Sequence, residues 1–168
     1  MDGFLAAYLC REIMWKPGGM KKLYIMSVKK QMEKNPWLRY IGSFSVEPGR
    51  RSITESFDYA AEMLAEPGNL LMFFPQGKLE SNHIRYIQME HGIREIVHRI
   101  KGDNVQLLWC STTIEYFESL KPSVCFDMMD CGTNRDFDFD QLQNKINSFH
   151  RQSIEKNIRY TNEHIEYH

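Results

Sequence analysis

The sequence predicts a single α/β domain with a mostly parallel central sheet flanked by helices. Two observations carry this prediction: short apolar runs of strand length recur along the chain, and segments with helical spacing separate several of them. In the clearest case, a strand at 41–46, a helix at 52–64 and a strand at 70–74 follow one another, and a Pro-Gly pair separates each element from the next. Such a strand–helix–strand unit joins parallel strands through a right-handed crossover.

The other expected elements follow from apolar spacing and from turn residues. They are a helix behind Asp2, a strand at 23–26, a basic helix at 28–37 interrupted by Asn35-Pro36, a loop at 79–90, a helix at 93–100, strands at 105–114 and 123–129, and a last helix behind 136–140. The residues past Arg159 are polar and are expected to fray. We therefore expect one domain over 1–160 and a polar tail over 161–168.

Length and composition are those of a soluble globular protein. The 168 residues suffice for one core, and 42% apolar with 26% charged residues is ordinary for this class. A net charge of −1 gives no overall field that attracts nucleic acid, and no apolar run is long enough to span a bilayer. The four cysteines lack metal-ligand spacing, so we expect reduced thiols, a cytoplasmic setting and no metal site.

The end of the strand at 70–74 is the strongest candidate site. Its apolar run stops at Pro75, at what we expect to be the carboxyl edge of the sheet, where open α/β folds usually bind their ligands. Gly77 lets the backbone approach a substrate closely, while Gln76 and Lys78 add a hydrogen-bonding group and a cation. An ordinary strand exit with a surface lysine is the alternative interpretation of the same residues.

A second candidate surface lies between Trp15 and Arg39, where cations and large aromatic side chains alternate. Glu33 is the one acid against seven cations: Lys16, Lys21, Lys22, Lys29, Lys30, Lys34 and Arg39. Trp15, Tyr24 and Trp37 lie among them, a combination suited to an anionic membrane surface. A solvated helix face with its tryptophans packed inside explains the segment equally well, and no nucleic-acid-binding motif accompanies it.

Several blocks in order resemble the glycerophosphate and lysophospholipid acyltransferases of the PlsC type. The family signature is His-x4-Asp, then Gly-x-x-Phe-Ile-x-Arg, then Phe-Pro-Glu-Gly-Thr-Arg-Ser, then a strand that contains Val-Pro. The matching stretches here are Asp2-Gly3, Gly42 to Val46 with Arg50 or Arg51, Phe74-Pro75-Gln76-Gly77-Lys78, Met89-Glu90-His91-Gly92, and 105–111. The resemblance covers roughly Asp2 to Met129, which is most of the chain.

This resemblance implies a PlsC-like fold and acyl transfer from acyl-CoA or acyl carrier protein to a lysophospholipid-like acceptor at the inner face of the cell membrane. No bound cofactor is implied, because the acyl donor is a co-substrate. In the family, a histidine is the general base and the aspartate that Asp2 matches orients it. The second and third blocks hold the acceptor phosphate. Carried over, the acceptor-binding residues are Arg50, Arg51, Phe74, Pro75, Gln76, Gly77 and Lys78.

The departures from the family pattern bear on activity. The family histidine would lie five residues before Asp2, upstream of Met1, so we expect that the reading frame begins too late and that this chain is a poor catalyst. In-frame upstream codons without that histidine would overturn this expectation. Gln76 replaces the family glutamate, and Lys78-Leu79-Glu80 replaces Thr-Arg-Ser. An amine- or hydroxyl-bearing lipid other than lysophosphatidate therefore stays open as the acceptor.

The rival hypothesis is a catalytically inactive homologue that binds lipid or a membrane surface. Other catalytic patterns do not occur in the sequence: it has no Gly-x-Ser-x-Gly elbow, no His-Glu-x-x-His and no Gly-rich phosphate loop.

Overall fold

The computed structural model describes residues 8–10, 19–47, 52–78, 80–81, 83–102, 104–116 and 120–166, with side chains up to residue 157. The chain forms two compact units. The first comprises Met1–Pro75 and His91–Val105, and the second comprises Gln76–Glu90 and Gln106–His168. Each unit contains its own β-sheet.

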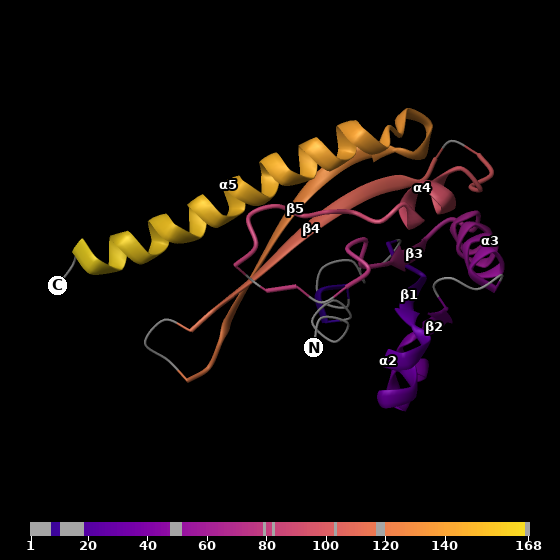
Figure 1. Cartoon of the computed structure of the whole chain (residues 1–168), viewed down its shortest axis with the longest axis horizontal. Helices are drawn as coiled ribbons and strands as arrows, with labels where there is room; N and C mark the ends of the chain where they lie inside the picture. The colour runs from indigo at the N-terminus through magenta and orange to yellow at the C-terminus, as the bar shows by residue number, and fades with distance from the viewer. Residues whose placement is uncertain are drawn as a thin grey trace. The chain divides into compact units, whose positions relative to one another are not determined.

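The first unit is a parallel sheet with helices, as the sequence predicts. Its elements are β1 (Lys22–Val28), α2 (Lys29–Lys34), the 3-10 helix η2 (Pro36–Ile41), β2 (Ser43–Val46), α3 (Ser52–Leu64), β3 (Asn69–Met72) and α4 (Gly92–Val97). The strand order is β2-β1-β3, with β1 in the centre (Figure 1). Because β1 is parallel to both neighbours, the carboxyl ends of all three strands share one edge of the sheet.

The core of the first unit forms where α3 packs on the strands. α3 buries Phe57, Ala60 and Ala61, which are spaced three and four residues apart and therefore share one helix face. Phe57 and Ala60 pack with Met26, Val46 and Ile96 from β1, β2 and α4. This arrangement confirms the predicted strand–helix–strand unit, although its two strands flank β1 instead of lying side by side.

The basic helix predicted over 28–37 is divided into α2 and η2. At the junction, the backbone N–H and the side-chain Nδ2 of Asn35 both donate to the Gln31 carbonyl, at 3.0 and 3.2 Å. Pro36 then opens η2, because proline lacks the N–H that would continue the α-helical ladder. Of the helix predicted behind Asp2, only Tyr8–Cys10 are described, and they are helical.

The second unit combines a long hairpin with a long helix. β4 (Gln106–Glu115) and β5 (Ser123–Thr133) pair antiparallel, and the 3-10 turn η3 (Asn134–Asp136) leads into α5 (Phe139–Glu166). α5 runs along the hairpin (Figure 1), and Lys156 Nζ lies 2.7 Å from Asp127 Oδ1 on β5. α5 extends through Glu166, so the helix includes most of the tail predicted over 161–168.

The prediction of one mostly parallel sheet is therefore only partly right. It holds for β1, β2 and β3, whereas β4 and β5 form a separate antiparallel sheet. The connection between β4 and β5, residues 116–122, is too short for the crossover of about a dozen or more residues that parallel neighbours need. Within the described ranges, no helix is long and apolar enough to cross a membrane.

Candidate functional site

The predicted site residues fall into three groups. Outside the described residues lie Asp2, Arg50 and Arg51. Phe74 and Pro75 are the last two residues of the segment Met1–Pro75, which belongs to the first unit. At the start of the second unit lie Gln76, Gly77 and Lys78. Each unit therefore carries its own part of the predicted set.

In the first unit, Phe74 and Pro75 leave β3 at the carboxyl edge of the parallel sheet. Val28 of β1 lies opposite Val46 of β2, and Ile25 lies opposite Met72 of β3. β3 ends at Met72, so Phe74 and Pro75 follow the end of the strand by two and three residues. Pro75 is buried, whereas Phe74 is 43% exposed and offers an apolar ring at this edge. The predicted placement at the carboxyl edge is therefore correct for these two residues.

An ion pair spans the same edge of the first unit. Lys29 Nζ, in the residue directly after β1, lies 3.2 Å from Glu47 Oε1, directly after β2. Both residues follow the last residue of a strand, so the pair lies at the carboxyl ends of β1 and β2. It neutralises one of the cations that the sequence assigns to the basic segment.

In the second unit, Gln76 and Lys78 are drawn together by one carboxylate. Glu80 Oε2 accepts a hydrogen bond from Gln76 Nε2 at 3.0 Å, and Glu80 Oε1 lies 3.1 Å from Lys78 Nζ. The two oxygens of one side chain thus hold both polar groups of the predicted site. We call Gln76, Gly77, Lys78 and Glu80 the Gly77 turn.

The charges of the Gly77 turn are balanced within the turn itself. The side chain of Glu80 is 18% exposed and that of Lys78 is 61% exposed. Hydrogen bonds from Lys78 and then Gln76 lower the pKa of the Glu80 carboxyl below its ordinary value of 4.5. Glu80 is therefore ionised near neutral pH, and the Lys78 ammonium already has a partner.

Gly77 is required by the backbone of this turn and by its neighbour Glu90. Its φ of +65° lies in the left-handed region that side chains disfavour. A Cβ built on Gly77 would lie 2.8 Å from Cγ of Glu90, closer than carbon atoms normally approach. The glycine of the third family-like block therefore lies against Glu90, a residue of the Met89-Glu90-His91-Gly92 stretch that the sequence treats as a separate match.

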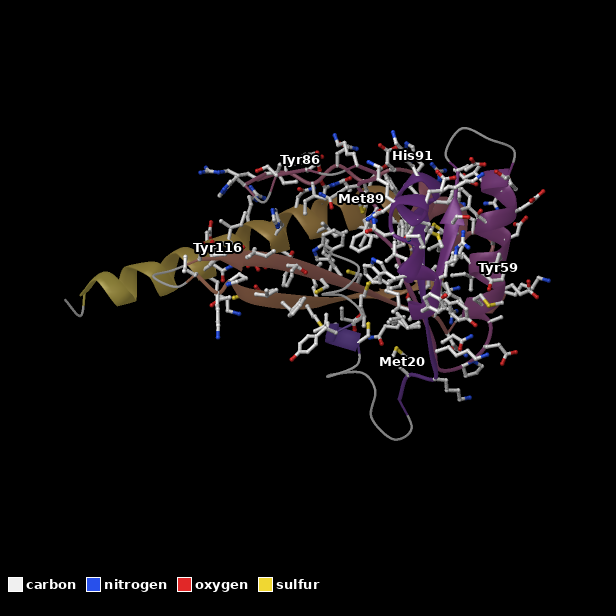
Figure 2. All side chains as sticks on the ribbon, turned by 90° about the horizontal axis from the view of Figure 1, so that it is seen from below. Met20, Tyr59, Tyr86, Met89, His91 and Tyr116 are labelled. Carbon is white, nitrogen blue, oxygen red and sulfur yellow. The ribbon has the colours of Figure 1, made fainter. Side chains whose placement is uncertain are left out.

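Side chains of α5 hold the segment that leads to Glu90. Asn147 Oδ1 accepts from the Ile87 N–H at 2.7 Å, and Gln143 Oε1 accepts from the Met89 N–H at 2.8 Å. His150 Nε2 lies 2.9 Å from the Ile84 carbonyl oxygen. Figure 2 marks this segment with Tyr86 and Met89, running alongside the helix.

These three α5 side chains supply the hydrogen bonds that a neighbouring strand would supply in a sheet. Gln143, Asn147 and His150 are spaced four and three residues apart, so they share one helix face. All three are buried, with relative exposures of 6% to 8%. The segment from Ile84 to Met89, without strand pairing of its own, is thereby fixed in position.

The chemistry that this arrangement can perform is binding and positioning through charged and amide groups. Burial raises the pKa of the Cys110 and Cys131 thiols, so neither is activated as a thiolate nucleophile. None of the four cysteines, all of which lie in the described ranges, forms a disulfide bond. Among the described side chains, no group of three or more His, Cys, Asp or Glu is placed to hold a metal ion.

Sequence reasoning missed the roles of four side chains: Glu80, Glu90, Gln143 and Asn147. Glu80 lies two residues from Lys78, and this spacing is the only sign of their pairing. Gln143 and Asn147 each directly follow a buried apolar residue, Leu142 and Ile146. Amides beside the apolar stripe of a helix are the signal that could have revealed them.

No protein-family model, curated protein or solved structure matches the chain. The resemblance to the PlsC-type acyltransferases therefore stays a prediction.

Proposed function

We propose that the protein transfers a fatty acyl group from acyl-CoA or acyl carrier protein to a lysophospholipid-like acceptor at the cytoplasmic face of the membrane. The observation that carries this proposal is the packing of Gly77 against Glu90. It joins two blocks that match the family signature separately in the sequence. The left-handed backbone at Gly77 also supports the match to the glycine of the third block.

In the proposed reaction, the acceptor oxygen or nitrogen attacks the thioester carbonyl carbon. Its proton passes to a general base, which in the family is the histidine five residues before the position of Asp2. The carbon–sulfur bond breaks, and the departing thiolate takes up the proton from the imidazolium. The products are an ester or amide and a free thiol. Asp2 is the residue that orients the imidazole and stabilises its charged form.

The Gly77 turn is the proposed binding element for the acceptor headgroup. Gln76 and Lys78 supply donors, with Arg50 and Arg51 as further cations by the resemblance; Phe74 and Pro75 complete the proposed acceptor-binding residues. Glu80 already pairs with Lys78, so a phosphate must compete with this carboxylate for the ammonium. An acceptor whose headgroup is uncharged, or carries an amine, avoids that competition. The acceptor class therefore extends beyond lysophosphatidate.

The same pairing favours a second candidate function, lipid or membrane-surface binding without transfer. A turn whose cation and amide are both held by Glu80 is neutral and internally satisfied. Such a turn can have a purely structural role, without binding a substrate. Lipid binding without release of a thiol from the acyl donor would distinguish this function from acyl transfer.

The experiment that tests acyl transfer uses a protein extended at its N-terminus by the residues that in-frame upstream codons encode. Thiol release from palmitoyl-CoA is followed in the presence of lysophosphatidate, lysophosphatidylethanolamine or monoacylglycerol, and mass spectrometry identifies the acylated product. The expected result is acceptor-dependent thiol release. Asp2→Asn is expected to lower the rate by about 10²-fold or more, because the base loses its orienting partner.

The matched control is Asp140→Asn, a neutralisation of equal size at an exposed position in the first turn of α5. It is expected to leave the rate unchanged. Equal rates with and without every acceptor, or an Asp2→Asn variant as fast as the parent chain, would overturn the acyltransferase proposal.

A further inference from the structure

α2 and η2 present a cationic and aromatic surface in the first unit. Its members, which we call the α2–η2 surface, are Lys30, Lys34, Trp37, Arg39 and Tyr40, all of them exposed. Tyr40 is 90% exposed and Trp37 is 44% exposed, while Met32 and Leu38 anchor the two helices in the core. Figure 1 shows α2 projecting beyond the ends of the three strands.

The cations of the α2–η2 surface lack acidic partners among the described residues. Lys30, Lys34 and Arg39 form no ion pair there, in contrast to Lys29, which contacts Glu47. Lys30 and Lys34 are four residues apart on α2, so two like charges share one helix face. Like charges at this spacing destabilise a helix. An external anion would relieve their repulsion.

The structure also narrows the basic segment that the sequence predicts. Lys22 is at the amino end of β1, at the other end of the strand from α2. Tyr24 is half-buried, and its ring packs edge-on against Tyr59, with centroids 6.5 Å apart. Lys22 and Tyr24 therefore do not belong to the α2–η2 surface.

The aromatic members of the surface are close together in η2. Trp37 and Tyr40 are three residues apart in a 3-10 helix, where such side chains lie directly above one another. Amphipathic rings of this kind settle at headgroup level, and neighbouring cations attract lipid phosphates. Exposed rings and cations without an acidic partner in the described part of the chain thus occur together on one short stretch.

We infer that the α2–η2 surface docks on a bilayer containing anionic lipids. Charge complementarity selects this occupant, because three cations face solvent there against the single carboxylate of Glu33. A second copy of the chain would bring like charges together in a symmetric contact. The inference does not depend on acyl transfer, since either proposed function can act on a membrane surface.

The test measures co-sedimentation of the chain with vesicles of equal parts phosphatidylglycerol and phosphatidylcholine, against vesicles of phosphatidylcholine alone. The parent chain is expected to bind the anionic vesicles and to lose binding at high salt, because salt screens the attraction. Lys30→Gln/Lys34→Gln is expected to weaken binding about 30-fold, from about 1 kcal/mol for each lysine near an anionic surface.

The matched control is Lys22→Gln/Lys101→Gln, the same charge change at two exposed positions of the same unit. It is expected to bind within about twofold of the parent chain, because neither lysine belongs to the surface. For the ring contribution, Tyr40→Ala is expected to weaken binding without changing its salt dependence. Tyr116→Ala, a ring 62% exposed in the second unit, is the control for that loss.

Three outcomes would overturn the inference. In the first, the parent chain fails to bind anionic vesicles. In the second, Lys30→Gln/Lys34→Gln binds as well as the parent, or the control pair loses as much. In the third, the chain binds a single-stranded RNA but neither vesicle, which would make this surface a nucleic-acid site. Circular dichroism of each variant verifies that the fold is retained.

Discussion

One side chain, Asn147, satisfies both backbone polar groups of Ile87. Its Oδ1 accepts from the Ile87 N–H at 2.7 Å, and its Nδ2 donates to the Ile87 carbonyl at 3.0 Å. Ile87 is 4% exposed and Asn147 is 6% exposed, so water cannot easily replace either bond. The amide of Asn147 thus bonds both backbone groups of Ile87, as the backbone of a neighbouring strand would in a sheet.

Asn147→Ala is expected to destabilise the protein by about 1–3 kcal/mol. The change removes both bonds and leaves a buried N–H without its acceptor, and each unsatisfied buried group costs about 1–3 kcal/mol. Urea denaturation followed by circular dichroism measures the free energy of unfolding. Asn144→Ala, at an exposed position on the same helix, is the control and is expected to lie within about 0.5 kcal/mol of the parent. Equal stability of the two variants would contradict the role of Asn147.

Gly42→Ala is expected to destabilise the first unit more than Gly102→Ala. Both glycines have a left-handed φ, +84° and +96° respectively. A Cβ at Gly42 would overlap the backbone carbonyl oxygen of Leu23, whereas a Cβ at Gly102 meets nothing within 4 Å. Gly102→Ala should therefore cost about 1–2 kcal/mol from backbone strain alone.

Gly42→Ala should cost clearly more, because the clashing atom belongs to the backbone of β1 and cannot rotate away. Denaturation midpoints of the two variants test the difference. Equal losses would show that strand β1 shifts easily at Leu23.

The fold of the first unit could be predicted because its signals are local. Apolar runs, Pro-Gly pairs and the helical stripe of Phe57 and Ala60 each lie within one element. The separate hairpin was missed for the opposite reason. Strands β4 and β5 have the composition of buried strands, and only the short connection between them excludes a parallel pairing. Weighing that length would have predicted the antiparallel sheet.

The candidate site could be predicted only in part. The positions of Phe74 and Pro75 follow from the strand that precedes them, since a strand's end fixes the edge at which its next residues lie. The partners of Gly77 and Ile87 are 13 and 60 residues away in sequence, at Glu90 and Asn147. No local pattern joins such distant residues. Polar contacts between elements therefore need the structure.

The lowered pKa of Glu80 makes a small part of the folding stability depend on pH. Hydrogen bonds from Lys78 and Gln76 lower this pKa in the folded state below 4.5. A lowered folded pKa contributes stability above the unfolded pKa, and this contribution is lost as pH falls through the folded value. We expect Lys78→Gln to raise the Glu80 pKa toward its ordinary value, measured by NMR titration of the carboxyl carbon. Lys101→Gln, an exposed lysine of the other unit, is the control and should leave it unchanged.

Glu80→Gln is expected to strengthen binding of phosphate-bearing acceptors, because it releases Lys78 from its carboxylate partner. Exposed charge pairs contribute little net free energy, so we expect the dissociation constant of a short-chain lysophosphatidate to fall by no more than about fivefold. Equilibrium dialysis measures this binding independently of catalysis. Monoacylglycerol, which lacks a phosphate, should bind the parent and the variant equally. The double variant Glu80→Gln/Lys78→Gln should lose the gain, since the freed ammonium is its physical cause. A gain that persists without Lys78, or extends to monoacylglycerol, would show that Glu80 does not act through this lysine.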